Sequence, residues 1–295
     1  MPQRPFANSG TATKLDTVFN YANFYSTVLR DKPSASSPFR LTYLDVFAGT
    51  GEIPFADDMP LLTDVVDAAN FIDGSARRAL QVQNPFSRYV FSDMKQKHTR
   101  ELEGLKRDFA HLADRIFVER GDANSVVKSF CAALGPADRA LVFLDPFGNQ
   151  VHWQTLEHIA ATKKIDLWYL FPAWIGVARQ VKNTGDLVND AEKSIDAMFG
   201  HHDWRSECLK TVLPSQGDLF SDDLTETQKI ATADGITRFM IQCMESIFGG
   251  GVSKKWLPLG RDGRHFYSLI FACSNPSSKA HTLAQRVAKE IMTRK

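Results

Sequence analysis

The sequence has few cysteines, and none of them stand close together. Four occur in 295 residues, with no Cys-x-x-Cys pair and no spacing typical of a metal site. This pattern argues against a cysteine-bound metal centre, and we predict no metal cofactor. We expect four buried, reduced thiols, at Cys131, Cys208, Cys243 and Cys273.

Long apolar runs and a strong net charge are also missing. Neither a signal-peptide run nor an 18-residue apolar span occurs, so we expect no membrane segment and a cytoplasmic location. The formal net charge of +1 argues against a protein that holds nucleic acid by charge alone, although a local basic groove is compatible with it. Hydrophobic and charged contents of 43% and 23% are typical of a globular protein.

One glycine is missing from the turn in residues 41–53, LTYLDVFAGTGEI. An apolar run typical of a buried parallel strand is interrupted by Asp45 and ends near Phe47. Two glycines follow, at which the backbone can turn sharply and a ligand can approach closely. A dinucleotide-binding fingerprint places glycine or alanine three residues after the second glycine, where this sequence has Pro54. On its own, the stretch is equally compatible with an ordinary tight turn.

The same residues resemble D-x-F-A-G-x-G, the first motif of class I S-adenosylmethionine-dependent methyltransferases. The second predicted strand, Tyr89–Asp93, ends in an acid, and a carboxylate can accept hydrogen bonds from both ribose hydroxyls. The fingerprint expects such an acid about 20 residues after the glycines. Asp93 has that spacing only if residues 52–73 form an excursion before a helix near Ser75, although a solvated acidic loop is the simpler interpretation of those residues.

Two more acids follow predicted strands, and all four strand ends should meet at one edge of a parallel sheet. Asp122 comes after the strand at 115–119 and resembles the residue that holds the adenine amine in methyltransferases, but it could equally cap the next helix. Asp145 comes after the strand at 140–144 and begins the sequence Asp-Pro-Phe-Gly.

Asp-Pro-Phe-Gly resembles the D/N-P-P-aromatic motif of amino-methyltransferases, in which the acid or amide and a backbone carbonyl accept hydrogen bonds from the target amine. Phe147 replaces the second proline and Gly148 replaces the aromatic residue, so the substrate class stays open. A simple turn after a strand is the alternative interpretation.

The remainder of the chain predicts how the sheet is completed. A fifth strand covers 165–171, and two strands at 254–259 and 265–274 form a hairpin joined by a turn with glycine and aspartate. A terminal antiparallel hairpin on a parallel sheet separates class I methyltransferases from dehydrogenases. We therefore predict an α/β, Rossmann-like class I methyltransferase fold with a mostly parallel seven-stranded sheet and a helical insertion.

The predicted organisation has three parts. Residues 1–172 hold an N-terminal helix and the methyltransferase-like core, 173–233 a helical insertion, and 234–295 the rest of the core with the hairpin and final helix. We expect insertion helices at 187–199 and 203–213, and a further helix over 225–248 that could break near Gly235. Within the insertion, His201-His202-Asp203 has metal-binding residue types, but a helix cap at Asp203 is the favoured interpretation.

The run at 142–172, VFLDPFGNQVHWQTLEHIAATKKIDLWYLFP, with YLDVFAGTGEI upstream, resembles the three-Cys-motif partner protein family. The resemblance covers roughly residues 13–172. It implies a methyltransferase-like fold and a companion protein that carries the cysteine motif, and it supports fold more strongly than activity.

Three functions are compatible with these patterns. The first is an S-adenosylmethionine-dependent methyltransferase acting on an amine, with a nucleic-acid base favoured because of the Asp-Pro-Phe-Gly motif and a basic C-terminal end. The second is a non-catalytic partner of the cysteine-motif companion or of nucleic acid, and the third, an NAD(P)-dependent oxidoreductase, is disfavoured by Pro54 and the hairpin. For the first, the expected cofactor-binding residues are Asp45, Phe47, Ala48, Gly49, Gly51, Asp93, Asp122 and Ala123, and the expected acceptor residues are Asp145, Pro146 and Phe147.

Overall fold

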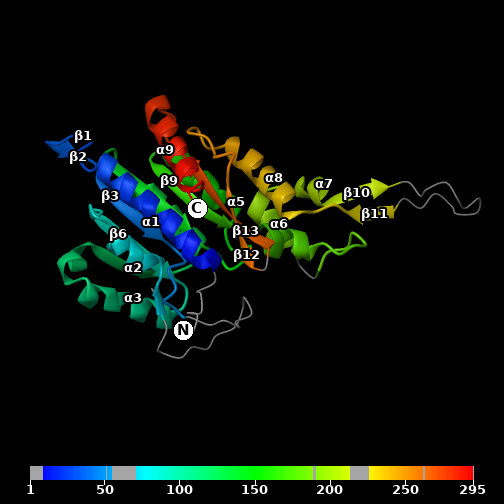
Figure 1. Cartoon of the computed structure of the whole chain (residues 1–295), viewed down its shortest axis with the longest axis horizontal. Helices are drawn as coiled ribbons and strands as arrows, with labels where there is room; N and C mark the ends of the chain where they lie inside the picture. The colour runs from blue at the N-terminus through cyan, green and yellow to red at the C-terminus, as the bar shows by residue number, and fades with distance from the viewer. Residues whose placement is uncertain are drawn as a thin grey trace, which may run out of the picture.

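The computed structural model describes residues 9–50, 52–54, 71–188, 191–212, 226–261 and 263–294. Seven strands form the central sheet, in the spatial order β12-β13-β9-β8-β3-β6-β7 (Figure 1). β13 runs antiparallel to both of its neighbours, β12 and β9, and the other neighbouring pairs in this sheet are parallel. This topology confirms the predicted fold class. The strands are β3 (Arg40–Asp45), β6 (Arg88–Asp93), β7 (Ile116–Arg120), β8 (Asp138–Leu144), β9 (Ile165–Phe171), β12 (Leu257–Arg261) and β13 (Arg264–Cys273).

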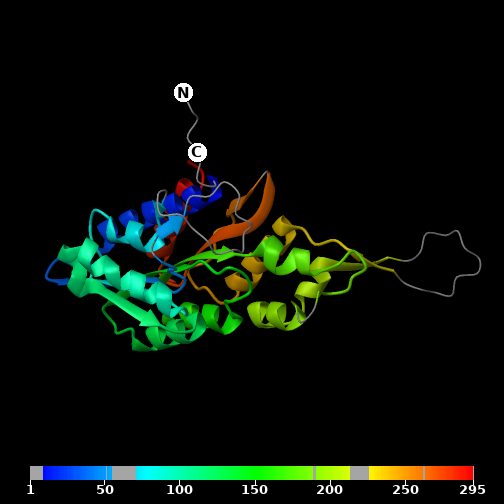
Figure 2. The same cartoon turned by 90° about the horizontal axis from the view of Figure 1, so that it is seen from below.

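Helices cover both faces of the sheet, because its strands are apolar on both sides. Along β8, Ala140, Val142 and Leu144 belong to a first core cluster, while Leu141 and Phe143 belong to a second on the opposite face. The second cluster is covered by α1 (Ser9–Leu29), α2 (Ser75–Leu80), α3 (Gln96–Asp108) and α9 (Ser278–Ile291). The first is covered by α4 (Ala123–Ala133), α5 (Trp153–Thr162), α6 (Ala191–Phe199), α7 (Trp204–Cys208) and α8 (Ala233–Glu245). Figure 2 shows the sheet between these two layers.

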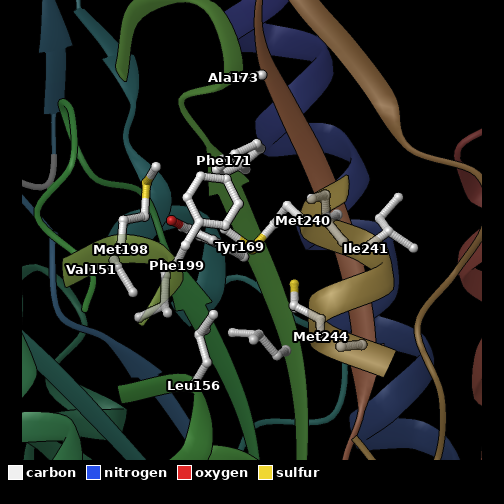
Figure 3. Close-up of a cluster of buried hydrophobic side chains, with 14 of the residues drawn as sticks. Val151, Leu156, Tyr169, Phe171, Ala173, Met198, Phe199, Met240, Ile241 and Met244 are labelled. Carbon is white, nitrogen blue, oxygen red and sulfur yellow. The ribbon is translucent and has the colours of Figure 1, made fainter. Parts of the chain in front are cut away.

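The predicted insertion contributes to the first core cluster. Met198 and Phe199 of α6 lie beside Tyr169 and Phe171 of β9, and all four side chains are buried (Figure 3). Residues from α8, among them Met240, join the same cluster. The insertion is therefore packed into the core that the sheet builds.

Part of the insertion differs from our prediction. Instead of continuing as a helix to residue 213, the chain ends α7 at Cys208 and forms β10 (Leu209–Val212), which pairs antiparallel with β11 (Glu226–Lys229) in a ribbon separate from the main sheet (Figure 1). Thr211 and Val212 are β-branched types that favour strands. The next helix begins at Ala233 rather than 225, because the Thr232 side chain caps it by accepting a hydrogen bond from the Gly235 amide at 3.0 Å. It does not break at Gly235.

The excursion after the glycine turn begins and ends in two short strands that pair with each other. β4 (Glu52–Pro54) pairs antiparallel with β5 (Phe71–Asp73), so that Glu52 lies opposite Asp73, and α2 begins at Ser75 as predicted. Residues 55–70 lie outside the described part of the chain.

The smaller elements are β1 (Pro33–Ser34), β2 (Ser37–Pro38), η1 (Ala110–Arg115), the π-helical turn η2 (Ala173–Val177) and η3 (Ala178–Gln180). None of the helices in the described ranges has the length and apolar character needed to cross a membrane.

Candidate cofactor and acceptor site

Three predicted site acids lie at one edge of the sheet because their strands are neighbours. β3 lies between β6 and β8, and Asp45 at its end is level with Phe91 of β6 and Phe143 of β8. Asp93 lies two residues after Phe91, and Asp145 lies two residues after Phe143. Ligands of open α/β sheets bind outside this carboxyl edge.

Asp45 is completely buried and connects the turn to the following helix. Its Oδ1 accepts a hydrogen bond from the Phe47 amide at 3.1 Å, and its Oδ2 accepts one from the Ser75 hydroxyl at 2.6 Å. Burial, together with the nearby Asp145 carboxylate, raises the pKa of Asp45 to about 7, although the Ser75 hydrogen bond opposes this shift. Asp45 thus links the turn at Phe47 to the start of α2 at Ser75, and its contact with a cofactor stays a prediction.

The turn after β3 provides an open backbone surface. The Ala48 amide donates to the Ser92 carbonyl at 3.1 Å, which ties the turn to β6. Gly49 has a φ of 59°, which strongly favours glycine, and a Cβ added there would meet no atom within 4 Å. Ala48 is buried and Phe47 half-buried, whereas Gly51 lies outside the described residues.

Asp93 is buried at the end of β6 with one oxygen engaged. Its Oδ1 accepts a hydrogen bond from the Lys95 amide at 2.8 Å and lies 3.1 Å from Nδ1 of His98. Within the described ranges, no donor reaches Oδ2. The next residue, Met94, is 62% exposed and places an apolar side chain at the same edge. From the sequence we did not predict an exposed apolar side chain at Met94, although its position directly after Asp93 places it at the carboxyl end of β6.

Asp122 and Ala123 lie at the start of α4. Asp122 is exposed and caps this helix, since its Oδ1 accepts hydrogen bonds from the Ser125 amide at 3.0 Å and the Ser125 hydroxyl at 3.1 Å. Ala123 is buried in the first core cluster. The structure therefore shows the capping role of Asp122, and its adenine contact stays a prediction.

Asp145 has a partner that the sequence did not suggest. Oδ2 of Asp145 lies 2.5 Å from Nζ of Lys14, which comes from α1, 131 residues earlier in the chain. The two side chains are only 20% and 12% exposed. No local sequence signal could have found Lys14, because its neighbours form an ordinary amphipathic helix.

Within the rest of the Asp-Pro-Phe-Gly loop, Phe147 faces outward and Pro146 is buried, and neighbouring side chains hold the loop in place. Phe147 is 64% exposed, its amide donates to Oε1 of Gln150 at 2.9 Å, and its carbonyl accepts from the Tyr267 hydroxyl at 3.4 Å. Pro146 is buried. Asn149 donates to the Gly176 carbonyl at 2.8 Å, which fastens the loop to the π-helical turn η2.

The favoured interpretation of His201-His202-Asp203 is correct only in part. Asp203 stands at the cap position of α7, but its side chain makes no capping hydrogen bond. Side-chain atoms of Glu192, Asp196 and His202 lie within 4.8 Å of one another. Arg205 pairs with Glu192, and Asp196 accepts from the Trp204 indole at 2.8 Å, so this group is already engaged as structure.

Comparison with models of protein families finds no match, and comparison with curated proteins finds none. Among solved structures, protein LPL1258 from Legionella pneumophila aligns over 97% of this chain and 92% of its own, with 13% identity and a TM-score of 0.47. Magnesium protoporphyrin IX methyltransferase from Synechocystis, solved with bound SAH, aligns over 92% and 88%, with 12% identity and a TM-score of 0.39. An O-methyltransferase from Bacillus cereus in complex with SAH aligns over 86% and 80%, with 12% identity and a TM-score of 0.38. All three scores lie below 0.5, so the fold assignment rests on the strand order alone.

Proposed function

We propose that this protein is an S-adenosylmethionine-dependent methyltransferase that acts on an amine, with a nucleic-acid base as the favoured acceptor. The observation that carries the proposal is the arrangement at the carboxyl edge: Gly49 with open space above it, Asp93 on one side and Asp145 on the other. The antiparallel β13 is the topological feature that argues against the dehydrogenase alternative.

The residues at this edge fit S-adenosylmethionine. The backbone around Gly49 leaves room for a ligand to approach, and Asp93 offers Oδ2 to hydroxyl donors, as a ribose requires. Met94 presents an apolar surface beside it, on which the adenine ring would lie. Phe47, Ala48, Asp122 and Ala123 would line the predicted cofactor path, and Asp45 would hold the turn.

When bound, S-adenosylmethionine supplies a methyl group on a positively charged sulfur. This chain's part is to hold and orient the amine that accepts it. The Asp145 carboxylate and the Pro146 carbonyl would accept hydrogen bonds from the amine, draw off its developing positive charge and direct its lone pair outward. Phe147 would pack against the acceptor.

Calorimetry with S-adenosylmethionine and with S-adenosylhomocysteine tests the proposal. We expect binding to the wild-type protein, loss of binding in Asp93→Ala, and unchanged binding in Glu101→Ala, an exposed carboxylate on α3. Asp145→Ala should keep cofactor binding and lose methyl transfer, because its carboxylate acts on the acceptor. Folded wild-type protein that takes up neither ligand at millimolar concentration would contradict the proposal.

A second candidate function is a non-catalytic binding protein, for a cysteine-motif companion or a nucleic acid. The Lys14–Asp145 ion pair favours it, because the predicted acceptor carboxylate already holds an amine of its own chain. Co-purification of the companion with a protein that binds no cofactor would select this function over the first.

A further inference from the structure

One of the two carboxylate oxygens of Asp145 has a hydrogen-bond partner. Lys14 contacts Oδ2 at 2.5 Å, and in the part of the chain that the structure describes no donor reaches Oδ1. Two oxygens of one carboxylate can serve two donors at once. Lys14 therefore leaves one acceptor position at the carboxyl edge of the sheet.

The helix that carries Lys14 is fixed to the sheet. Tyr21 lies seven residues further along α1, on the same helical face, and its hydroxyl donates to Oδ2 of Asp166 at 2.7 Å. Both residues are buried, and Leu15 and Val18 are buried beside them. Near its start, Gly10 approaches the backbone of Gly260. Lys14 is thus presented from a rigid element rather than from a loose arm.

The ion pair sets the charge of the acceptor position. Lys14 and Asp145 together carry no net charge, and the adjacent Asp45 is fully buried with a pKa of about 7. An incoming alkylammonium would have to displace Lys14, which is tethered to the site and is therefore present at high effective concentration. If Lys14 stayed in place, the alkylammonium would lose its hydration without gaining an unpaired negative charge as a partner. An uncharged amine needs only to donate one N–H to Oδ1.

The loop that carries Asp145 also exposes a surface that suits a flat ring. Phe147 follows Asp145 by two residues and exposes 64% of its surface, while the Tyr267 hydroxyl holds the Phe147 carbonyl from β13. An aromatic face of this kind stacks on planar rings, including nucleic-acid bases.

We propose that Lys14 is a positioning residue that holds Oδ2 of Asp145, leaves Oδ1 to the substrate, and so selects an uncharged amine on an aromatic ring over an alkylammonium. This inference rests on the proposed methyltransferase function. It assigns to α1 a direct part in substrate choice.

The test compares the wild-type protein with Lys14→Ala and Lys14→Arg. Arg78→Ala is the matched control, because Arg78 of α2 pairs with Asp16 of α1, the helix that also carries Lys14. Calorimetry first establishes cofactor binding for each variant. Transfer of a labelled methyl group is then measured to two probes: a single-stranded DNA oligonucleotide with all four bases, and a lysine-containing peptide. A second measurement without cofactor follows melting temperature as n-butylammonium chloride, the equivalent of a lysine side chain, is added against sodium chloride at equal ionic strength.

We expect the wild-type protein, Lys14→Arg and Arg78→Ala to methylate the oligonucleotide in preference to the peptide. Lys14→Ala should shift this preference toward the peptide by about tenfold or more, because the freed Asp145 carboxylate can bind the lysine ammonium and accept the proton that its nitrogen must lose before it takes the methyl group. A purely structural loss would instead lower both rates together. n-Butylammonium should restore the preference, and without cofactor it should raise the melting temperature of Lys14→Ala alone.

Three results would overturn the inference. The first is an unchanged substrate preference in Lys14→Ala, and the second is a cofactor-bound wild-type protein that prefers the peptide or methylates neither probe. The third is the same n-butylammonium response in the wild-type protein and in Lys14→Ala. Absence of cofactor binding in the wild-type protein is a different result, which rejects the proposed function itself.

Discussion

At the scale of single residues, Asp45 is a buried carboxyl group with a strongly raised pKa. Its pKa is about 7 in the folded protein, against a usual value of 3.8, with burial as the main cause. The folded state therefore keeps this proton to higher pH than the unfolded chain does. Unfolding releases the proton between these two values, so rising pH favours unfolding across that window.

We expect the free energy of unfolding of the wild-type protein, relative to Asp45→Asn, to fall as pH rises from about 4 to about 7 and to level off above that. A shift of this size corresponds to about 4 kcal/mol as an order of magnitude. Urea unfolding at several pH values measures it. Asp31→Asn, at an exposed aspartate, is the control and should show no such difference. A flat difference between wild type and Asp45→Asn would contradict the assignment.

The residue scale also shows what sequence reasoning can reach. Asp45, Asp93 and Asp145 could be placed at one edge because each follows an apolar strand, and the carboxyl ends of parallel strands meet. Lys14 could not be found, since its contact with Asp145 depends on how α1 crosses the sheet. The outcome for Asp122 was undecidable from sequence, because a helix cap and an adenine contact require the same residue at the same place.

At the scale of elements, a buried hydrogen bond ties α1 to the central sheet. The Tyr21 hydroxyl donates to Asp166, a buried carboxyl group whose pKa is raised mainly by burial. Tyr21→Phe removes this donor and leaves the carboxyl group short of a partner, which should cost about 1–3 kcal/mol of stability. Urea unfolding measures the loss, and hydrogen exchange should show α1 exchanging faster.

Tyr25→Phe provides the matched control for Tyr21→Phe. Tyr25 lies one turn further along the same helix and is also buried, but its hydroxyl forms no hydrogen bond to the residues that the structure describes. We expect a change within about 0.5 kcal/mol. Equal losses in the two variants would show that the Tyr21–Asp166 bond does not hold the helix.

Strands with continuous apolar runs and the terminal hairpin of β12 and β13 were predicted well, whereas the ribbon of β10 and β11 was not. The strand at 165–171 matches its predicted bounds because seven consecutive residues are buried on both faces of the sheet. Residues 209–212 form a strand instead of a helix because they pair with 226–229, a partner that a local window does not contain. The helix start at Ala233 follows from the Thr232 cap, a signal that was present in the sequence and was missed.

At the scale of the whole molecule, the two core clusters share one set of strands. Residues of β8 and β9 alternate between the clusters, so loosening either face disturbs the strands that support the other. The insertion helix α6 is part of this arrangement through Ile195, Met198 and Phe199. We therefore expect the described parts of the insertion to unfold together with the rest of the core.

Two large-to-small substitutions test this cooperativity. Ile195→Ala in α6 and Leu102→Ala in α3 each remove a fully buried side chain, one from each cluster, and each should cost about 2–5 kcal/mol. Hydrogen exchange read separately for α3, α6 and β8 should show the same loss of protection in all three elements for either variant. If Ile195→Ala instead weakened α6 alone and left α3 and β8 at wild-type protection, the insertion would be a separate folding unit that only rests against the sheet.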